Sequence, residues 1–211
     1  MKERGMIFNA EMVKALLDGR KTQTRRPVKP QPNISYFPKR IPEGWNGSFS
    51  VDGGKSFKCP FGVVGDRIWV RETFWLVDSW AMGDIPCVLY ADEFEKYQDE
   101  GWQCYQSYDF WSKRAYHGKY TFGCKPPIHM PRWASRITLE ITDVRVDRVQ
   151  DISYSDAYAE GVERKSGDCL DHFMEFKRGN SIRAFEMGWN SIYNNWDDNP
   201  WVWVVEFKVA L

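Results

Sequence analysis

Apolar residues near the N-terminus are spaced as on one face of an α-helix. Asn9 is a favourable N-cap residue, and Gly19 can end a helix in the left-handed backbone conformation. Between them, apolar residues recur with the i, i+1, i+4, i+5 spacing of a buried stripe. We therefore predict a helix of about ten residues after Asn9. Its buried positions are Met12, Val13, Leu16 and Leu17.

Alternating polar and apolar residues predict strands in several other segments. In one of them Ile68 and Val70 share a face, and the preceding Gly65-Asp66 dipeptide predicts a turn. Residues 136–149 fit either two paired strands or one bent strand. The strand with Ile68 and Val70 lies within residues 67–74. The remaining predicted strands lie within residues 20–26, 87–91 and 201–209.

Two more helices are predicted in the C-terminal half. Ser153 and Asp156 match a capping box, so a short helix begins there and ends at Glu160-Gly161. Ser181 is predicted to cap a longer helix. The apolar face of that helix consists of Ile182, Phe185, Trp189 and Ile192.

Two long segments interrupt the regular pattern. Residues 27–60 are rich in Pro, Gly, Asn and Ser, and residues 78–131 mix aromatic, acidic and turn-forming residues. We predict that both are insertions.

The composition fits a globular protein and excludes several classes of function. Of the 211 residues, 43% are hydrophobic, which is enough for a core. Twenty-nine basic and 29 acidic residues give no net charge, so any attraction to nucleic acid or lipid has to be local. No apolar run approaches the ~20 residues of a membrane-spanning helix, and the N-terminus lacks the apolar core of a signal peptide. We expect a cytoplasmic protein that does not associate with a membrane.

The cysteines and histidines form no recognisable metal or disulfide motif. The five cysteines are widely spaced and include no C-x-x-C pair, and the three histidines are equally dispersed. We predict free thiols, no metal site and no cofactor.

Basic residues gather near the N-terminus. Residues 1–40 contain ten Lys or Arg and three acidic residues, and no acidic residue lies between Arg20 and Arg40. Such a segment is expected where a protein binds a phosphate-bearing ligand. A solvated basic face paired with acids elsewhere in the protein would have the same sequence.

Three residues are candidates for catalysis on local grounds. Glu160 lies at the end of a predicted helix, where the helix dipole disfavours a carboxylate, and such conflicts occur at functional sites. Lys21 lies in a cationic cluster that favours loss of its proton, and the amine could then activate the Thr24 hydroxyl. Lys21 and Thr24 converge only if Lys21 lies in the turn after Gly19 or a bulge intervenes, because residues three apart on a regular strand face opposite sides. A surface residue without a role is the alternative for each.

The order of several motifs resembles the ASCH domain of the PUA-like superfamily, small β-barrels with flanking helices. The motifs follow the first helix and are G-R-K-T-Q-T-R-R at 19–26, Gly65-Asp66 before a strand, A-Y-A-E-G at 157–161 and V-W-V-V-E-F at 202–207. Residues 65–74, G-D-R-I-W-V-R-E-T-F, are similar to a segment of phage and prophage ASCH-like proteins. The resemblance implies an α+β fold, a PUA-like mixed β-barrel with flanking helices. It also implies one domain over residues 1–211 that carries the two insertions.

The resemblance extends to bacterial ASCH enzymes that hydrolyse N(4)-acetylcytidine to cytidine and acetate. Their Lys, Thr and Glu match Lys21, Thr24 and Glu160. The match implies that Lys21 is the base, Thr24 attacks the acetyl carbonyl and Glu160 handles the proton to the departing cytosine amine. The implied activity is an amidohydrolase acting on a modified pyrimidine nucleoside or nucleotide. Its predicted ligand contacts are Arg25, Arg26 and Arg71. The bacterial enzyme has an apolar residue at the position of Arg25. The positive charge of Arg25 makes the site more basic than a free nucleoside requires, and this favours a phosphorylated ligand.

Two other functions fit the sequence. Some PUA-like domains bind RNA without catalysis, and here the stretch 20–40 would hold phosphates of RNA or single-stranded nucleic acid while exposed tryptophans stack on bases. The other is a phage interaction protein whose aromatic surface binds a host factor. Most of the 11 tryptophans are nevertheless expected to pack in the interior.

Overall fold

Strands and helices combine into an α+β fold in the computed structural model, which describes residues 1–33, 48–50, 56–77, 87–90, 116–117, 120–121, 123–163 and 175–210. The helices are α1 (Ala10–Leu17), α4 (Tyr154–Ala159) and α5 (Glu175–Ile192), with short 3₁₀ helices at Pro127–His129, Arg132–Ala134 and Val149–Asp151. The strands are β1 (Glu3–Ile7), β2 (Gln23–Pro27), β3 (Ser48–Ser50), β4 (Ser56–Lys58), β5 (Arg67–Arg71), β6 (Phe74–Val77), β7 (Cys87–Tyr90), β8 (Tyr116–His117), β9 (Tyr120–Thr121), β10 (Gly123–Lys125), β11 (Thr138–Arg148) and β12 (Trp201–Val209).

The largest sheet has five strands in the order β1-β5-β11-β12-β2. A second sheet has the order β10-β6-β7, and β3-β4 and β8-β9 are hairpin pairs. The predicted α+β class is confirmed. Among the strands that the structure describes, β1 and β2 are the edges of the largest sheet, so these strands do not close into the barrel that the resemblance implies.

The chain divides into two compact units. The first comprises Met1–Arg4, Lys14–Ile68 and Thr138–Leu211, and the second comprises Gly5–Val13 and Trp69–Ile137. Much of the predicted insertions at 27–60 and 78–131 lies outside the described residues. The single domain and its insertions therefore stay a prediction. No helix in the described part of the chain is long and apolar enough to cross a membrane.

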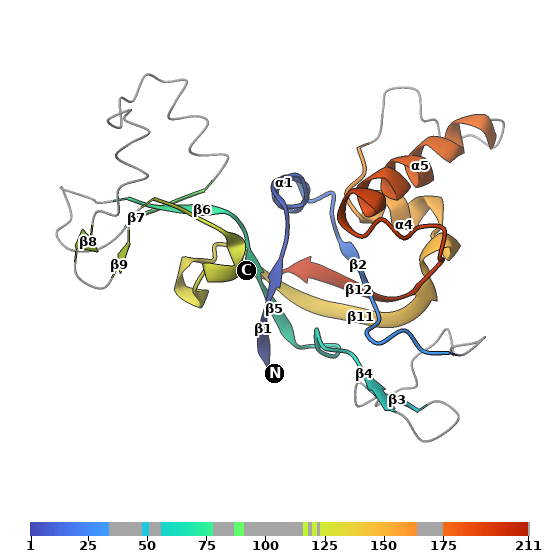
Figure 1. The fold of residues 1–211 in the computed structure, drawn as a ribbon, viewed down its shortest axis with the longest axis horizontal. Coiled ribbons are helices and arrows are strands. Elements are labelled where there is room, and N and C mark those ends of the chain that lie inside the picture. The colour runs from blue at the N-terminus through green and yellow to red at the C-terminus, as the bar shows by residue number, and fades with distance from the viewer. Residues whose placement is uncertain are drawn as a thin grey trace. The chain divides into compact units, whose positions relative to one another are not determined.

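The core of the first unit lies between β12 and the helices α4 and α5, which cover the same side of the sheet (Figure 1). Val202 and Val204 of β12 are fully buried and pack in one cluster with Phe185 and Trp189 of α5. Among the described residues of this unit, four tryptophans are buried: Trp189, Trp196, Trp201 and Trp203.

Local sequence signals are confirmed at two helix starts and in one strand. Asn9 caps α1, because its side-chain oxygen accepts from the Met12 amide at 2.8 Å. Ser153 and Asp156 form the predicted capping box of α4. The predicted strand 201–209 matches β12, whose residues from Trp201 to Val205 are all buried.

Strand β11 resolves the two alternatives for residues 136–149. It is one strand with a bulge between Ile141 and Asp143, where its register against β12 shifts. Leu139 and Ile141 are buried before the bulge, and Val144 and Val146 are buried after it. The extra residue keeps the apolar side chains on one face of a strand that would otherwise present them to both.

The prediction that Ser181 caps a helix is wrong. Helix α5 begins at Glu175, so Ser181 lies inside it and is buried. The preceding Gly179 resembles a helix break in the sequence, but a single glycine costs a helix only about 1 kcal/mol, which packing can offset. The predicted apolar face is correct for Ile182, Phe185 and Trp189, whereas Ile192 is 46% exposed.

The second unit has its own apolar cluster around the sheet of β6, β7 and β10. Phe74, Leu76, Met130 and Ala134 are buried there. Arg136 lies over the Tyr90 ring and forms two hydrogen bonds with the Glu72 carboxylate, at 3.0 and 2.9 Å.

The predicted turn at Gly65-Asp66 fixes the start of β5 in the first unit. Gly65 has a φ of +85°, and the Asp66 carboxylate accepts hydrogen bonds from the Lys2 amide at 2.7 Å and from Arg4 at 3.0 Å. Burial would raise the pKa of Asp66, but these bonds and one from the Val63 amide outweigh it and lower the pKa below its ordinary value of 3.8.

Replacing Asp66 by Asn should therefore destabilise the protein in a pH-dependent way. The ionised carboxylate is stabilised in the folded state, so its contribution is present above pH 3.8 and is lost as the pH falls through the lower pKa of the folded protein. We expect Asp66→Asn to lower the free energy of unfolding by about 1–3 kcal/mol at pH 7. Urea unfolding at pH 7 and at pH 3 checks this, with the exposed Asp198→Asn as the control. A loss of equal size at both pH values would contradict it.

Candidate functional site

Lys21 lies in the connection between α1 and β2, and backbone hydrogen bonds fix this connection. The Ala15 carbonyl accepts from the amides of both Arg20 and Lys21 at 2.9 Å. The Thr22 amide donates to the Ala159 carbonyl at 2.8 Å, which ties the connection to the end of α4. Lys21 is therefore outside the strand, in the segment that follows Gly19.

Lys21 and Glu160 form a buried ion pair. The Lys21 ammonium donates to Glu160 Oε2 at 2.7 Å and to the Glu160 main-chain carbonyl at 2.8 Å. The side chain of Lys21 is 0% exposed and that of Glu160 is 5% exposed. The ammonium thus compensates both the carboxylate and the negative end of α4, which accounts for an acid at the C-terminus of a helix.

Burial lowers the pKa of Lys21 below its ordinary value of 10.5. The charge and the hydrogen bond of Glu160 raise it, and the charges of Arg26 and Arg25 lower it further. Loss of the proton is easier than for a lysine in water, as a general base requires.

Gly161 allows the end of α4 to lie close to Ala15 and Lys21. Its φ is +98°, and a Cβ at this position would lie 2.8 Å from the Ala15 Cβ and 3.2 Å from the Lys21 Cβ. A residue with a side chain would therefore separate the end of α4 from the connection that carries Lys21.

Arg25 of β2 is the second buried cation beside Glu160. Its Nη2 donates to Asp156 Oδ2 at 3.1 Å, and its Nη1 donates to Gln23 Oε1 and lies 3.7 Å from Glu160 Oε1. The Arg25 side chain is 0% exposed and lies 5.9 Å from the centre of the Phe185 ring. Gln23 also donates to Asp156 Oδ1 at 3.1 Å.

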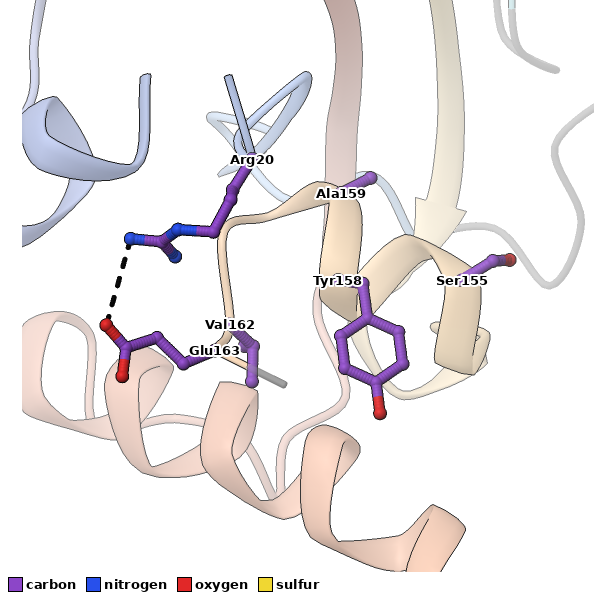
Figure 2. A pocket seen from close by; sticks show the side chains of 6 residues that line it. All are labelled: Arg20, Ser155, Tyr158, Ala159, Val162 and Glu163. Atoms are coloured by element: carbon purple, nitrogen blue, oxygen red, sulfur yellow. Dashed lines mark ion pairs between the residues drawn. The ribbon is translucent and has the colours of Figure 1, made fainter. Parts of the chain in front are cut away.

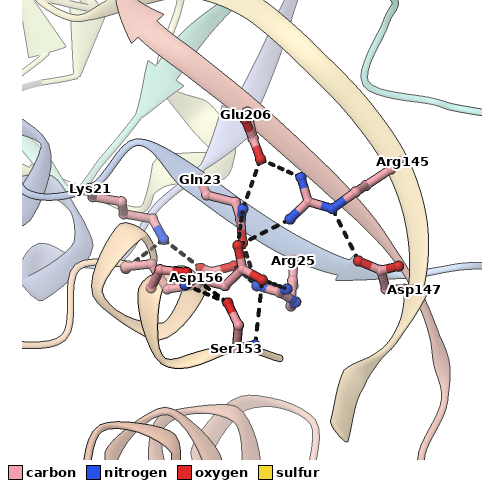
Figure 3. Close-up of polar contacts among 10 residues, drawn as sticks. Lys21, Gln23, Arg25, Arg145, Asp147, Ser153, Asp156 and Glu206 are labelled. Atoms are coloured by element: carbon pink, nitrogen blue, oxygen red, sulfur yellow. Dashed lines mark hydrogen bonds and ion pairs between the residues drawn. The ribbon is translucent and has the colours of Figure 1, made fainter. Parts of the chain in front are cut away.

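Arg145 of β11 completes this polar cluster, drawn in Figure 3. It donates to Asp156 Oδ1 and Asp147 Oδ2 at 3.1 Å each, and also to Glu206. Burial would raise the pKa of Asp156, but the hydrogen bond from Gln23 and the charge of Arg25, with Ser153 and Arg145, lower it. Asp156 is therefore held as an anion between two arginines.

Two atoms of the cluster are buried without a hydrogen-bond partner. They are Oε1 of Glu160 and Nε of Arg25. The first is an acceptor and the second a donor, and both belong to side chains whose other polar atoms are engaged. Burying an unpaired polar atom costs about 1–3 kcal/mol, so these atoms are candidates for contacts with a ligand.

Thr24 does not lie on the face of β2 that carries Gln23 and Arg25. It is 1% exposed and pairs across the sheet with Val205. Because side chains alternate along a strand, Thr24 points to the side opposite Gln23 and Arg25. The structure thus brings Lys21, Glu160 and Arg25 together, with Thr24 on the other face.

The two other predicted ligand contacts have partners elsewhere. Arg26 is half-buried and donates to the Tyr193 hydroxyl at 3.3 Å. Arg71 belongs to the second unit, where it donates to the Ile128 carbonyl and lies 5.2 Å from the centre of the Trp69 ring.

Sequence reasoning missed Gln23, Arg145 and Glu206 and assigned Asp156 only to the helix cap. Alternation along residues 21–25 was the available signal, because positions 21, 23 and 25 share one face when 22 and 24 face away. Nothing local indicated Arg145 or Glu206. The pairing of β11 with β12 places Arg145 opposite Val204, and the pairing of β12 with β2 places Glu206 opposite Gln23.

A hollow of about 640 Å³ lies beside the last turn of α4 (Figure 2). Arg20 and Glu163 form an ion pair at 3.8 Å on its wall. Hollows of this size hold small organic ligands. The lining residues are Arg20, Ser155, Tyr158, Ala159, Val162 and Glu163.

The described residues include no group of three His, Cys, Asp or Glu side chains placed to hold a metal ion. Cys59 and Cys124 are free thiols, and burial raises the pKa of Cys59 to about 11. This thiol is a poor nucleophile at neutral pH.

Comparison of the chain with protein-family models, with curated proteins and with solved structures finds no match. The resemblance to ASCH domains rests on the motifs alone.

Replacing Gly161 by Ala should destabilise the protein, because the new methyl group meets Ala15 and the φ of +98° is unfavourable for a residue with a Cβ. We expect a loss of about 1–3 kcal/mol in the free energy of unfolding. Gly188→Ala in α5 is the matched control, since its Cβ would meet nothing within 4 Å and alanine favours a helix by about 0.5–1 kcal/mol. Denaturant unfolding checks this, and equal effects of the two substitutions would contradict it.

Proposed function

We propose that this protein is an amidohydrolase that removes an acyl group from a modified pyrimidine, an N(4)-acetylcytidine-like nucleoside or nucleotide. The observation that carries the proposal is the buried Lys21–Glu160 pair, in which the amine has a lowered pKa and the carboxylate keeps one oxygen without a hydrogen bond. The ASCH resemblance selects the same two residues independently of this geometry.

The pair supplies the proton transfers that amide hydrolysis needs. A hydroxyl adds to the acyl carbonyl and loses its proton to Lys21 as the base. The C–N bond then breaks, and the exocyclic nitrogen takes up a proton through Glu160, which leaves cytidine and an acyl group on the hydroxyl oxygen. Water hydrolyses that ester to acetate. Proton transfer of this kind contributes about 10²–10⁴-fold to a rate.

Thr24 is the predicted nucleophile, and its position makes it the most informative residue to replace. Lys21 lies outside β2, so one condition for its approach to Thr24 is met. The alternation of β2 directs Thr24 away from Arg25, which contacts Glu160. A water molecule activated by the same pair is the nucleophile if Thr24 can be replaced without loss of turnover.

A substrate has to reach the buried Glu160 carboxylate for this reaction to occur. Lys21 and Arg25 are fully buried, so a substrate has to displace side chains that cover Glu160. The hollow at Tyr158 and Ala159 adjoins Glu160 in the chain and has the volume for a nucleoside.

We propose further that residues 1–211 form one ASCH domain of the PUA-like type, with insertions at about 27–60 and 78–131. In support, the matching motifs fall on adjoining elements of the largest sheet and its helices. They occupy the α1–β2 segment, the start of β5, the end of α4, and β12.

Binding of RNA or single-stranded nucleic acid without catalysis is less well supported. Two described cations of the basic segment are not available for phosphates, because Lys21 and Arg25 are buried and pair with Glu160 and Asp156. Binding through several phosphates weakens steeply with salt. We expect acetylcytidine hydrolysis to vary less than about threefold between 50 and 300 mM NaCl, since a neutral nucleoside has no phosphate. A steep decrease would favour the nucleic-acid function instead.

Hydrolysis of N(4)-acetylcytidine, followed by chromatography of released cytidine, tests the proposed enzyme directly. Lys21→Ala, Thr24→Ala and Glu160→Gln should each lower kcat by about 10²-fold or more, because each removes a group that moves a proton or attacks the carbonyl.

Three exposed residues provide matched controls: Lys14→Ala, Thr22→Ala and Glu11→Gln should retain turnover within about twofold. No release of cytidine by the wild-type protein would overturn the proposed activity. Full turnover in Thr24→Ala alone would remove Thr24 as the nucleophile and leave the Lys21–Glu160 pair in place.

A further inference from the structure

Asp156 holds both terminal nitrogens of the Arg25 guanidinium, one directly and the other through Gln23 (Figure 3). Its Oδ2 accepts from Nη2 of Arg25 at 3.1 Å. Its Oδ1 accepts from Nε2 of Gln23 at 3.1 Å, and Oε1 of that amide accepts from Nη1 of Arg25. The carboxylate is itself fixed, because Arg145 donates to Oδ1 at 3.1 Å and the Ser153 amide donates to Oδ2 at 3.4 Å. One carboxylate thus sets where the guanidinium lies.

The fixed guanidinium lies beside Glu160 without donating to it. Nη1 of Arg25 is 3.7 Å from Oε1 of Glu160, beyond hydrogen-bond range, and Oε1 has no hydrogen-bond partner. A shift of about 1 Å would bring the two atoms to an ordinary bonding distance. The two side chains are 0% and 5% exposed, so solvent ions screen their attraction only weakly. The contacts with Asp156 and Gln23 oppose that shift.

The open oxygen of Glu160 is the one that the proposed reaction needs. Lys21 donates to Oε2, so a proton passes to the leaving nitrogen through Oε1. A hydrogen bond from Arg25 would occupy Oε1 and favour its charged form, which hinders proton transfer through it. Asp156 and Glu160 are four residues apart, so α4 presents both acids on one side, towards β2.

We propose that Asp156 is a positioning residue for the Lys21–Glu160 pair, because it holds Arg25 at a distance that leaves Oε1 of Glu160 open. The inference rests on the proposed function and adds a residue that acts through Arg25 without touching the substrate. The two cations beside Glu160 then have different roles. Lys21 donates to the carboxylate, and Arg25 is held back from it.

Replacing Asp156 by Asn removes the charge that holds Arg25 and keeps the shape of the side chain. The helix start is retained, because Ser153 Oγ accepts from the main-chain amide of residue 156. We expect kcat for N(4)-acetylcytidine to fall by about tenfold or more, because Arg25 moves onto Glu160. KM should change by less than about threefold, since Asp156 does not contact the substrate. Asp156→Glu restores the charge and keeps a capping box, and should recover kcat to within about threefold of the wild type.

Asp147→Asn is the matched control. Asp147 accepts from Arg145 at 3.1 Å, as Asp156 does, whereas the contacts of Arg25 are with Gln23, Asp156 and Glu160. It should keep kcat and KM within about twofold. Gln23→Leu is a second test that does not depend on the folding of Asp156→Asn. It frees the nitrogen nearest Glu160 and should lower kcat by at least about threefold.

The ionisation of Lys21 reports the position of Arg25 even without turnover. Burial lowers the pKa of Lys21, Glu160 raises it, and the charge of Arg25 lowers it further. With Arg25 moved onto Glu160, the pKa of Lys21 should fall by about 1 or more in Asp156→Asn and stay unchanged in Asp147→Asn. NMR titration of the Lys21 Nζ signal, assigned with Lys21→Arg, measures this. In an Arg25→Gln background, Asp156→Asn should leave the pKa unchanged, because no guanidinium remains to move.

The outcomes separate this inference from the proposed enzyme. An unchanged kcat in Asp156→Asn, an equal loss in Asp147→Asn, or an unchanged pKa of Lys21 in Asp156→Asn would each overturn the inference, even though the wild type hydrolyses acetylcytidine. If the wild type hydrolyses nothing, the proposed function fails, and the titration alone decides whether Asp156 acts on the pair. A fall in the pKa of Lys21 that requires Arg25 would support the inference in either case.

Discussion

The burial of the Lys21 ammonium is the constraint on which the surrounding structure depends. A charge removed from water costs several kcal/mol unless an opposite charge and hydrogen bonds replace the solvent. Glu160 supplies both, through its carboxylate and its main-chain carbonyl. The same contact offsets the unfavourable position of an acid at the end of α4. Two locally unfavourable choices therefore stabilise each other, and Gly161 is needed to bring them within reach.

Charges of alternating sign continue outward from this pair. Arg25 lies between Glu160 and Asp156, and Asp156 lies between Arg25 and Arg145. Each ion is thus held on two sides, from α4, β2 and β11. Such a cluster is rigid when its polar atoms have hydrogen-bond partners, and removing one side chain lowers the stability of the protein. Within the described part of the basic segment, Lys21 and Arg25 are therefore neutralised by acids of the same unit.

The parts of the fold that sequence predicts well are those set by neighbouring residues. The helix caps at Asn9 and Ser153 depend on residues a few positions apart. The same is true of strand β12, whose apolar residues follow one another in the sequence. Spacing cannot pair Lys21 with Glu160, because 139 residues separate the two. Only the resemblance to ASCH domains groups them before the structure does. Arg145 carried no local signal, since it meets Asp156 through the packing of α4 against the sheet. Ser181 was misjudged because its preference for helix ends is weaker than the packing of α5.

The bulge in β11 has a consequence for how this protein can change. It acts as a phase shift: on one side of Thr142 the odd-numbered residues face the interior, and on the other side the even-numbered ones do. Arg145 and Asp147 owe their place on the polar face to that single extra residue. Deleting it would leave the composition almost untouched and exchange the two faces for half of the strand. The number of residues in β11 therefore decides which side chains reach the polar face.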